Sequence, residues 1–262
     1  MTIEDWEQVP DGKIPASELA YQNTNDDIKD PTDPSPPYEE SIAQPQPTGP
    51  ARLKILGATW GGVIVTSELQ SMIKTPAPTP SSSSSAESSF ETLKLNMHTL
   101  HTKLLPDPAV HLIKTLTVIY QYSTLGSELL LLNATQFAPQ ITVTVTPTAH
   151  EEKVRLGFPK FFSSLGSTPT AFWQASPQSR VEIVAVLYGT QRIQTAAVLE
   201  ELARFFEGQR GQIRMTTGFF RTDPWLGVKK TWTVYFRFVG SMRGMQCVTG
   251  VEDGALEAPW GI

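Results

Sequence analysis

The sequence predicts an α+β fold that is mainly β, in which two tandem, diverged repeats pack as a pseudo-twofold pair around a shared core. Residues 223–238 align without a gap with residues 107–122, sharing an Asp-Pro pair, a Lys-Thr-x-Thr-Val pattern and two aromatic positions. Residues 186–194 match residues 58–66 around an aromatic-Gly pair. Segments such as 141–145 alternate between apolar and polar side chains, as half-buried strands do. Each repeat is expected to contain a strand, a short helix and three further strands.

The first repeat is expected over residues 51–146. Its first strand ends at a Gly-Gly turn, and Thr66 is placed to cap a short helix over 67–73 through its side-chain oxygen. Residues 75–89 are rich in proline and serine and are expected to form a flexible loop. Strands are expected over residues 52–60, 92–97, 115–122, 128–132 and 141–145.

The second repeat is expected over residues 181–262 and contains the clearest helix of the chain. Apolar side chains recur at helical spacing over 195–206, and Gly208 follows as a C-terminal cap. The aromatic-Gly pairs lie 128 positions apart, whereas the Asp-Pro pairs lie 116 positions apart. The first repeat therefore holds extra residues, which its proline- and serine-rich loop accounts for. Strands are expected over residues 181–188, 212–216, 231–238 and 245–249.

Two segments lie outside the repeats. Residues 1–50 contain few aliphatic side chains and many Asp, Glu, Pro, Ser and Gln residues. Such a segment cannot bury enough apolar surface to offset its ordering entropy, so a disordered tail is predicted. Residues 147–180 carry five aromatic side chains. A plain solvated linker would not carry so many aromatic side chains. This connector is therefore expected to pack across both repeats.

Composition and charge argue against several classes of protein. The 262 residues carry a net charge of −5 with a pI near 5.4, which disfavours nucleic acid as a partner. Cys247 is the single cysteine, so no disulfide can form within the chain. The acidic N-terminus lacks the apolar region of a secretory signal, and no apolar run has the length of a transmembrane helix. The sequence thus predicts a cytoplasmic protein of a reducing compartment.

No catalytic, cofactor-binding or metal-binding set is expected. His98 and His101 are three positions apart, which on a strand places them on opposite faces, and further metal ligands are missing. An aspartate before proline recurs in both repeats, where its carboxylate can cap the following turn. A positioned Asp/Lys pair is the functional alternative, but lysines at strand ends often serve solubility. The repeat signature comprises Trp60, Gly61, Asp107, Pro108, Lys114, Tyr188, Gly189, Asp223, Pro224 and Lys230.

The tail contains one candidate docking motif for a protein partner. Pro36, Pro37 and Tyr38 are similar to the Pro-Pro-x-Tyr ligands of WW domains, whose aromatic grooves bind pre-extended proline segments. Ser35 stands where the usual spacing needs a proline. The incomplete motif therefore favours the alternative, a solvated proline-rich tail.

The repeat signature resembles the C-terminal β-rich domain of the DnaJ-type co-chaperone subfamily C member 11 and of related fungal proteins. That domain has an aromatic-Gly turn after a strand, a Val-Thr step into a short helix, and then an Asp-Pro-x-x-Gly-x-x-Lys segment. The resemblance covers about two-thirds of the chain and implies the same β-rich unit, present here twice. The chain has no His-Pro-Asp triplet of a J-domain, so the resemblance implies neither co-chaperone activity nor any reaction.

The expected function is that of a non-catalytic intracellular binding or adaptor protein with a protein partner. No His, Cys, Glu or Ser pair recurs in step across the repeats, as a duplicated active site would require. The alternative is a metal-free isomerase or cyclase that uses an apolar cavity in or between the repeats. No cofactor is expected, a small-molecule ligand is compatible with either function, and the oligomeric state is left open.

Overall fold

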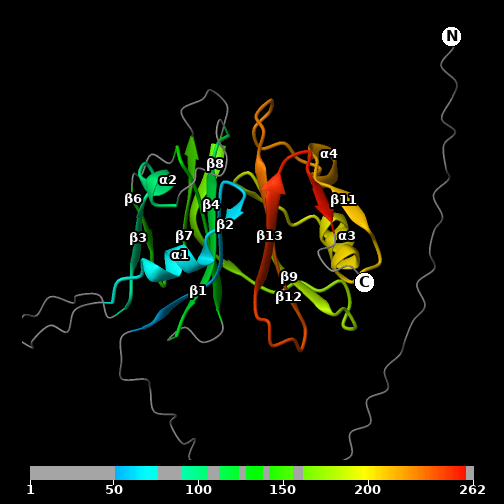
Figure 1. Ribbon diagram of the computed structural model, residues 1–262, viewed down its shortest axis with the longest axis horizontal. Coiled ribbons are helices and arrows are strands. Elements are labelled where there is room, and N and C mark those ends of the chain that lie inside the picture. Colours follow the sequence, from blue (N-terminus) through cyan, green and yellow to red (C-terminus); the bar gives the residue numbers. More distant parts are fainter. Residues whose placement is uncertain are drawn as a thin grey trace, which may run out of the picture. The chain divides into compact units, whose positions relative to one another are not determined.

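The computed structural model describes residues 51–75, 90–104, 112–123, 128–137, 142–155 and 162–257. These residues all belong to one unit of the chain, Pro47–Ile262. Their fold is mainly β, with several antiparallel sheets and a few short helices, as the sequence predicts (Figure 1). Within the described residues, no helix combines the length and the apolarity that crossing a membrane requires.

Two antiparallel sheets form the centre of this unit. The first sheet has the strand order β2-β1-β4-β5-β8-β7, and the second has the order β10-β9-β12-β13. The strands of the first sheet are β1 (Leu53–Trp60), β2 (Val63–Ile64), β4 (Thr115–Tyr122), β5 (Leu129–Thr135), β7 (His150–Arg155) and β8 (Phe162–Thr170). The strands of the second sheet are β9 (Val181–Tyr188), β10 (Gln191–Arg192), β12 (Thr231–Phe238) and β13 (Gln246–Val251).

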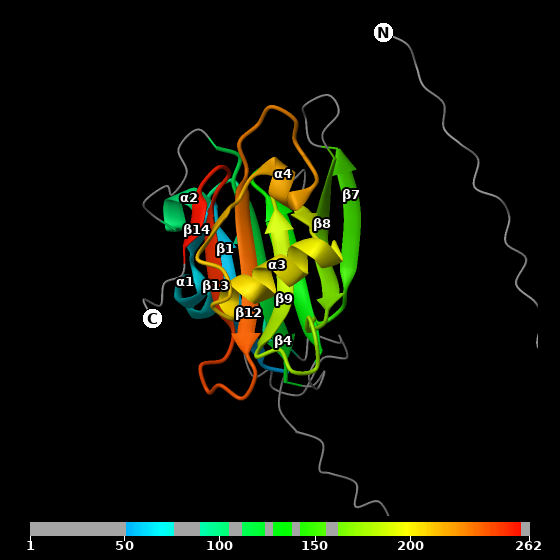
Figure 2. The same ribbon diagram turned by 90° about the vertical axis from the view of Figure 1, so that its right-hand side faces the viewer.

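Each sheet is covered on its outer face by small elements of its own (Figure 1 and Figure 2). The helix α3 (Ala196–Phe206) crosses the outer face of the second sheet, because its apolar side chains lie on one stripe. The first sheet is covered by α1 (Thr66–Ser71), α2 (Leu100–Lys103), β3 (Leu93–Asn96) and β6 (Thr142–Val145). The second sheet is covered by α3 (Ala196–Phe206), α4 (Thr217–Phe220), β11 (Gln212–Arg214) and β14 (Ala255–Glu257).

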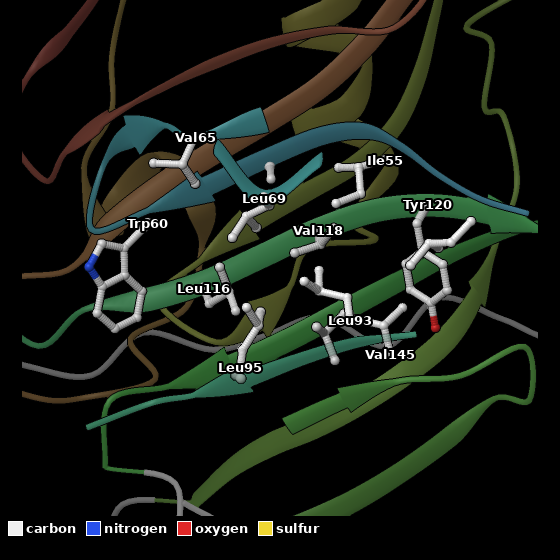
Figure 3. Close-up of a cluster of buried hydrophobic side chains, with 14 of the residues drawn as sticks. Ile55, Trp60, Val65, Leu69, Leu93, Leu95, Leu116, Val118, Tyr120 and Val145 are labelled. Atoms are coloured by element: carbon white, nitrogen blue, oxygen red, sulfur yellow. The ribbon is translucent and has the colours of Figure 1, made fainter. Parts of the chain in front are cut away.

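Two hydrophobic cores lie between the sheets and these outer elements. In the first core, Trp60 and Val118 of the sheet pack with Leu69 of α1 and Leu93 of β3 (Figure 3). In the second core, Phe236 of β12 packs with the buried side chains of α3. The shared core that the sequence predicts is a third, separate cluster of buried residues from both halves. Each half has a core of its own, because the side chains of its strands that point outward are covered within the same half.

The two sheets pair their strands in the same register. Trp60 ends β1 and Tyr188 ends β9, and each strand then turns back into a two-residue strand, β2 or β10. The pairing of β1 with β4 skips one residue at Leu56, and the pairing of β9 with β12 skips one residue at Val184. Both sheets thus carry a bulge at the same distance from the turn. A bulge bends its strand locally, so the two sheets bend at corresponding points.

The sheets contact each other through a smaller, partly polar layer. Its buried apolar members are Ile119, Leu129, Leu131, Val184, Ala185, Leu187 and Tyr235. Threonine hydroxyl groups accompany them: Thr115 Oγ1 lies 3.0 Å from Thr231 Oγ1, and Thr59 Oγ1 lies 3.1 Å from Thr233 Oγ1. Because these hydroxyl groups are buried, each needs a partner, and the facing sheet supplies one.

The predicted connector over 147–180 contains two strands that extend the first sheet. Strand β8 pairs with β5, and β7 pairs with β8 at the edge of the sheet. The end of this range joins the second sheet instead, because Trp173 exchanges two backbone hydrogen bonds of 2.8 and 2.9 Å with Ile183 of β9. The segment thus contacts both halves while contributing strands, rather than lying across them as a loop.

Thr66 does not cap helix α1, contrary to the sequence-based expectation. The residue before the helix is Val65, and no side chain caps it. Thr66 Oγ1 instead accepts a hydrogen bond of 2.9 Å from the backbone N–H of Ala58 in β1. An unpaired strand edge leaves N–H donors without partners, and Thr66 satisfies one of them.

Candidate functional site

The signature residues of the second half meet at the turn between β9 and β10. Gly189 adopts a φ of 58°, and its N–H donates a hydrogen bond of 2.8 Å to the carbonyl oxygen of Thr231. A Cβ atom here would lie 3.4 Å from Pro224 Cγ and 3.5 Å from Trp225 Cζ3. The aromatic-Gly pair and the Asp-Pro segment therefore recur together because the turn packs directly against that segment.

Lys230 is buried at the centre of this contact, with 1% of its surface exposed. Its Nζ lies 2.8 Å from Asp223 Oδ1 and 3.3 Å from Glu252 Oε2. It also donates hydrogen bonds to the carbonyl oxygens of Trp225 (3.1 Å) and Val228 (2.6 Å). The expectation of a solvent-exposed strand-end lysine is wrong here, because two carboxylates and two carbonyl groups replace the water around the ammonium group.

Tyr188 and Thr217 complete the arrangement, which we call the Lys230 cluster: Lys230, Asp223, Glu252, Tyr188 and Thr217. The Tyr188 hydroxyl group donates to Glu252 Oε1, and Thr217 Oγ1 donates to the same oxygen at 2.6 Å. Lys230 Nζ lies 5.3 Å from the centre of the Tyr188 ring, within reach of a cation–π contact. Every polar side chain in the cluster is thus satisfied by another member or by the adjacent backbone.

Burial and contacts shift the pKa values of two members. Burial raises the pKa of Tyr188, and the hydrogen bond that its hydroxyl donates to Glu252 raises it further. Burial alone would raise the pKa of Glu252. The hydrogen bonds from Thr217 and Tyr188 and the charge of Lys230 outweigh it, so the pKa of Glu252 lies below its ordinary value of 4.5. Glu252 is therefore ionised at neutral pH and counters the charge of Lys230.

The stability of the protein is expected to fall in acid because of Glu252. A carboxyl group whose pKa is lowered by folding contributes stability above its ordinary pKa, here 4.5, and loses it as the pH falls through the folded value. Glu252→Gln should reduce the slope of unfolding free energy against pH below about 4.5, as measured by urea unfolding. Glu200→Gln, on the exposed side of α3, should keep the parental slope. An unchanged slope in Glu252→Gln would show that this carboxyl group is not linked to folding.

The first half repeats part of this arrangement. Gly61 has a φ of 56°, its N–H donates to the carbonyl oxygen of Thr115 at 3.0 Å, and Trp60 and Lys114 are both buried. The residue in the place of Glu252 is Gln136, since its N–H donates to Lys114 as that of Glu252 donates to Lys230. The signature residues Asp107 and Pro108 lie outside the described residues, so the first half provides only this part of the comparison.

The other residues singled out in the sequence do not join a common site. Pro36, Pro37 and Tyr38 lie outside the described residues, as does the side chain of His101. His98 is exposed in the turn before α2. Burial raises the pKa of the Cys247 thiol, which packs against the layer between the sheets. Among the described residues, no group of three His, Cys, Asp or Glu residues is placed to hold a metal ion.

Sequence reasoning missed Glu252, Thr217 and Trp225. Trp225 is fully buried against Gly189, and its backbone N–H donates a hydrogen bond of 3.1 Å to Asp223 Oδ1. The repeat comparison could not find Glu252, because the first half has a glutamine in its place. Glu252 is identified by the hydrogen bond that its N–H donates to the carbonyl oxygen of Lys230, which corresponds to the bond from Gln136 to Lys114. This correspondence is visible only in the folded chain.

The described residues combine two facing antiparallel sheets, a separate core on the outer face of each, and a buried ion cluster at one turn. Comparisons of the chain with protein-family models, with curated proteins and with solved structures find no match. The geometry of the described residues is therefore the basis for assigning a function.

Proposed function

We propose that this protein is a non-catalytic, cytoplasmic binding or adaptor protein whose body is a duplicated β-rich unit. The observation that carries the proposal is the Lys230 cluster, in which the polar groups bond to one another and not to a ligand site. Residues retained for catalysis would face a cavity, whereas Lys230 and Tyr188 are shut off from solvent. The signature residues are thus suited to stabilising the fold. Partner binding is therefore proposed for other surfaces of the body and for the tail.

The proposed duplication is supported by the correspondence of strand register. The turn glycines Gly61 and Gly189 have φ values of 56° and 58°, and each donates its N–H to the first threonine of the paired strand. The bulges of β1 and β9 fall at corresponding residues. We also propose that this unit is the one found in the C-terminal domain of the DnaJ-type co-chaperone subfamily C member 11. The match of the signature residues is the basis for this part of the proposal.

The proposed pseudo-twofold pairing is supported by what lies between the sheets. Thr115 and Thr231 are 116 positions apart, occupy equivalent places, and contact each other through their hydroxyl groups. A residue that contacts its own equivalent lies on a twofold axis. The apolar layer between the sheets contains both members of four equivalent pairs: Ile119 and Tyr235, Leu129 and Met245, Leu131 and Cys247, and Leu56 and Val184.

Exposed apolar side chains support a protein partner. Leu226 exposes 80% of its surface beside the Asp-Pro segment, and Val239 and Met242 are exposed where β12 turns into β13. Single exposed apolar residues are common on monomers, but several on loops offer anchors for a partner. The alternative of an acid–base enzyme requires two convergent titratable groups in a cavity. Arg192 is the single titratable side chain among the described residues that line the cavity beside β9.

If Pro36, Pro37 and Tyr38 form a docking site in spite of Ser35, the tail recruits a WW-type partner. Tyr38→Ala in the full chain should abolish binding of a purified WW domain, because the tyrosine ring would no longer fill the aromatic groove. The parent chain should bind at roughly micromolar affinity, as short docking motifs do. Ser35→Pro should tighten binding, since it completes the motif. Fluorescence anisotropy of a labelled WW domain measures all three.

Tyr21→Ala is the matched control for this experiment, because it removes a tyrosine from the same tail outside the motif. It should bind the WW domain like the parent chain. The melting temperature of the body should be the same in all variants if the tail only docks partners. Equal binding by Tyr38→Ala and the parent chain would refute the docking motif, and the adaptor function would then rest on the body alone.

A further inference from the structure

The two central sheets end at four strands, β2, β7, β10 and β13, and only β13 lacks a feature that discourages pairing with another chain. Strands β2 and β10 are two residues long, and β7 has the sequence HEEKVR, which is rich in charged residues. Shortness and charge both protect a sheet edge. Strand β13 is six residues long and contains neither a charged residue nor a proline. Its edge is therefore suited to accept another strand.

The backbone groups of Cys247 and Thr249 point outward along this edge. The N–H of Glu252 donates a hydrogen bond of 2.8 Å to the carbonyl oxygen of Lys230 in the pairing of β13 with β12. Bonded and non-bonded pairs alternate in an antiparallel ladder, so the groups of Val248 face β12 and those of Cys247 and Thr249 face away from it. Among the described residues, none bonds to these outward groups.

The first half has a strand in the corresponding place. Strand β5 is the equivalent of β13, with Leu131 and Asn133 in the places of Cys247 and Thr249. The outward edge of β5 is paired with β8, which runs antiparallel along it and passes both residues. No described strand fills the same place beside β13. The first half thus shows what kind of element fits there, namely a single antiparallel strand.

Ile64 of β2 faces this vacant place. Its equivalent is Arg192 of β10, whose guanidinium group donates to the carbonyl oxygen of Pro169 at 3.1 Å and to Thr170 Oγ1 at 2.7 Å, both in β8. The short strand after the turn therefore contacts the strand that covers the facing sheet edge. Ile64 stands opposite Thr59, so its side chain lies on the face of the first sheet that meets the second. Ile64 exposes 51% of its surface, and a strand beside β13 would cover it.

A second copy of this chain does not fit here through its own β13. The inner side of β13 is covered by β1, since a Cβ atom at Gly57 would lie 3.8 Å from Cγ of Met245, which precedes β13. If β13 of a second copy paired at this edge, its β1 would need the space beside Ile64 that β2 already occupies. A single extended segment brings no such second layer.

Charged side chains at the two ends of β13 complement one direction of a bound segment. Arg243 precedes the strand and Asp253 follows it, both are exposed, and neither has an ion-pair partner among the described residues. A segment antiparallel to β13 begins beside Asp253 and ends beside Arg243. A basic residue at its start and an acidic residue at its end therefore match this edge.

We propose that the β13 edge site, formed by Cys247, Thr249 and Ile64, binds an extended segment of a protein partner as an antiparallel strand. The segment has apolar side chains at alternate positions facing Ile64, a basic residue before them and an acidic residue after them. Its backbone bonds to the outward groups of β13 as β8 bonds to those of β5. The proposal rests on the proposed binding function and gives that function a surface on the body, separate from the tail motif.

The probe is the end-blocked peptide Lys-Val-Thr-Val-Thr-Val-Glu, whose valines share one face of a strand. In ¹⁵N–¹H spectra of the full chain, the amides of Cys247 and Thr249 should shift downfield on titration, with a dissociation constant of roughly 0.1 mM. The amide of Val248 already faces β12 and should shift less. The peptide with its Lys and Glu exchanged should bind at least about threefold more weakly at low salt.

Ile64→Ser should weaken binding of the peptide by about tenfold, because the valines lose their apolar contact. Val63→Ser is the matched control, since Val63 stands opposite Trp60 and its side chain lies on the other face of β2. It should bind the peptide like the parent chain. Val63 and Ile64 are both exposed, so both variants should keep the fold.

Equal binding by Ile64→Ser and the parent chain would overturn the proposed place of the segment. Slow hydrogen exchange of the Cys247 and Thr249 amides in the chain without peptide would show that the edge is already covered. Slow exchange only at high protein concentration would assign the edge to a second copy, and either result overturns the proposal. If saturating peptide leaves these amides unshifted while a WW domain still binds the tail, the β13 edge site is refuted and the proposed binding function stands.

Discussion

Replacing Lys230 by methionine is expected to lower the free energy of unfolding by about 3–5 kcal/mol, the cost of removing one partner from a buried ion cluster. Methionine has a similar length but no charge, so Asp223 and Glu252 would lie close together with nothing to counter them. The carbonyl oxygens of Trp225 and Val228 would also lose their donor. Urea unfolding followed by circular dichroism measures the change.

Lys229→Met is the matched control, because it makes the same substitution one position earlier on an exposed side chain. It should change the unfolding free energy by no more than about 0.5 kcal/mol. Adding Glu252→Gln to Lys230→Met should recover part of the loss, since one of the two unpaired charges is then removed. A loss below about 1 kcal/mol for Lys230→Met would mean that the cluster does not stabilise the Asp-Pro segment.

Substituting alanine for Gly57 is expected to destabilise the contact between the two sheets by about 1–3 kcal/mol, as overpacking of a filled site does. A Cβ atom at Gly57 would lie 2.8 Å from Cε1 of Tyr235 on the facing sheet. That ring cannot swing aside freely, because the Tyr235 hydroxyl group donates to the carbonyl oxygen of Thr117 at 3.0 Å. Thermal unfolding of the full chain detects the loss.

Gly211→Ala serves as the control, because a Cβ atom there would meet nothing within 4 Å. Its effect should be neutral or slightly stabilising, since alanine restricts the unfolded chain more than glycine. Tyr235→Leu should make room for the new methyl group. The combined Gly57→Ala and Tyr235→Leu variant should therefore lose less stability than the sum of the two single variants. Additive losses would place the strain elsewhere than at this contact.

The sequence predicted the long, apolar elements well. The central strands β4, β9 and β12 and the helix α3 lie close to where alternation and helical spacing place them. Local pattern suffices for these elements because their own side chains form the two cores. Strands β7 and β8 were missed, because β8 is rich in serine and also contains glycine and proline, which are typical of loops. Its pairing with β5 is a long-range contact that overrides this local preference.

The candidate site was predictable only in part. The repeat signature identified Tyr188, Gly189, Asp223 and Lys230, and the structure brings all four together. Nothing in the local sequence indicates that Lys230 is buried, since a lysine beside another lysine usually faces solvent. Its burial depends on Glu252, which arrives from the end of β13.

The hydroxyl groups between the sheets bear on how such a protein could arise. A surface built from Thr115, Thr117 and their neighbours presents hydroxyl groups beside the apolar side chains of Ile119 and Leu131, so a single unit would expose a partly polar face that suits a second copy. The contact of Thr115 with Thr231 joins equivalent positions, which is the geometry of a symmetric homodimer. Under the proposed duplication, an ancestral dimer of separate chains became one polypeptide by gene fusion. Each half was then free to diverge, one keeping a glutamate and the other a glutamine at the same place.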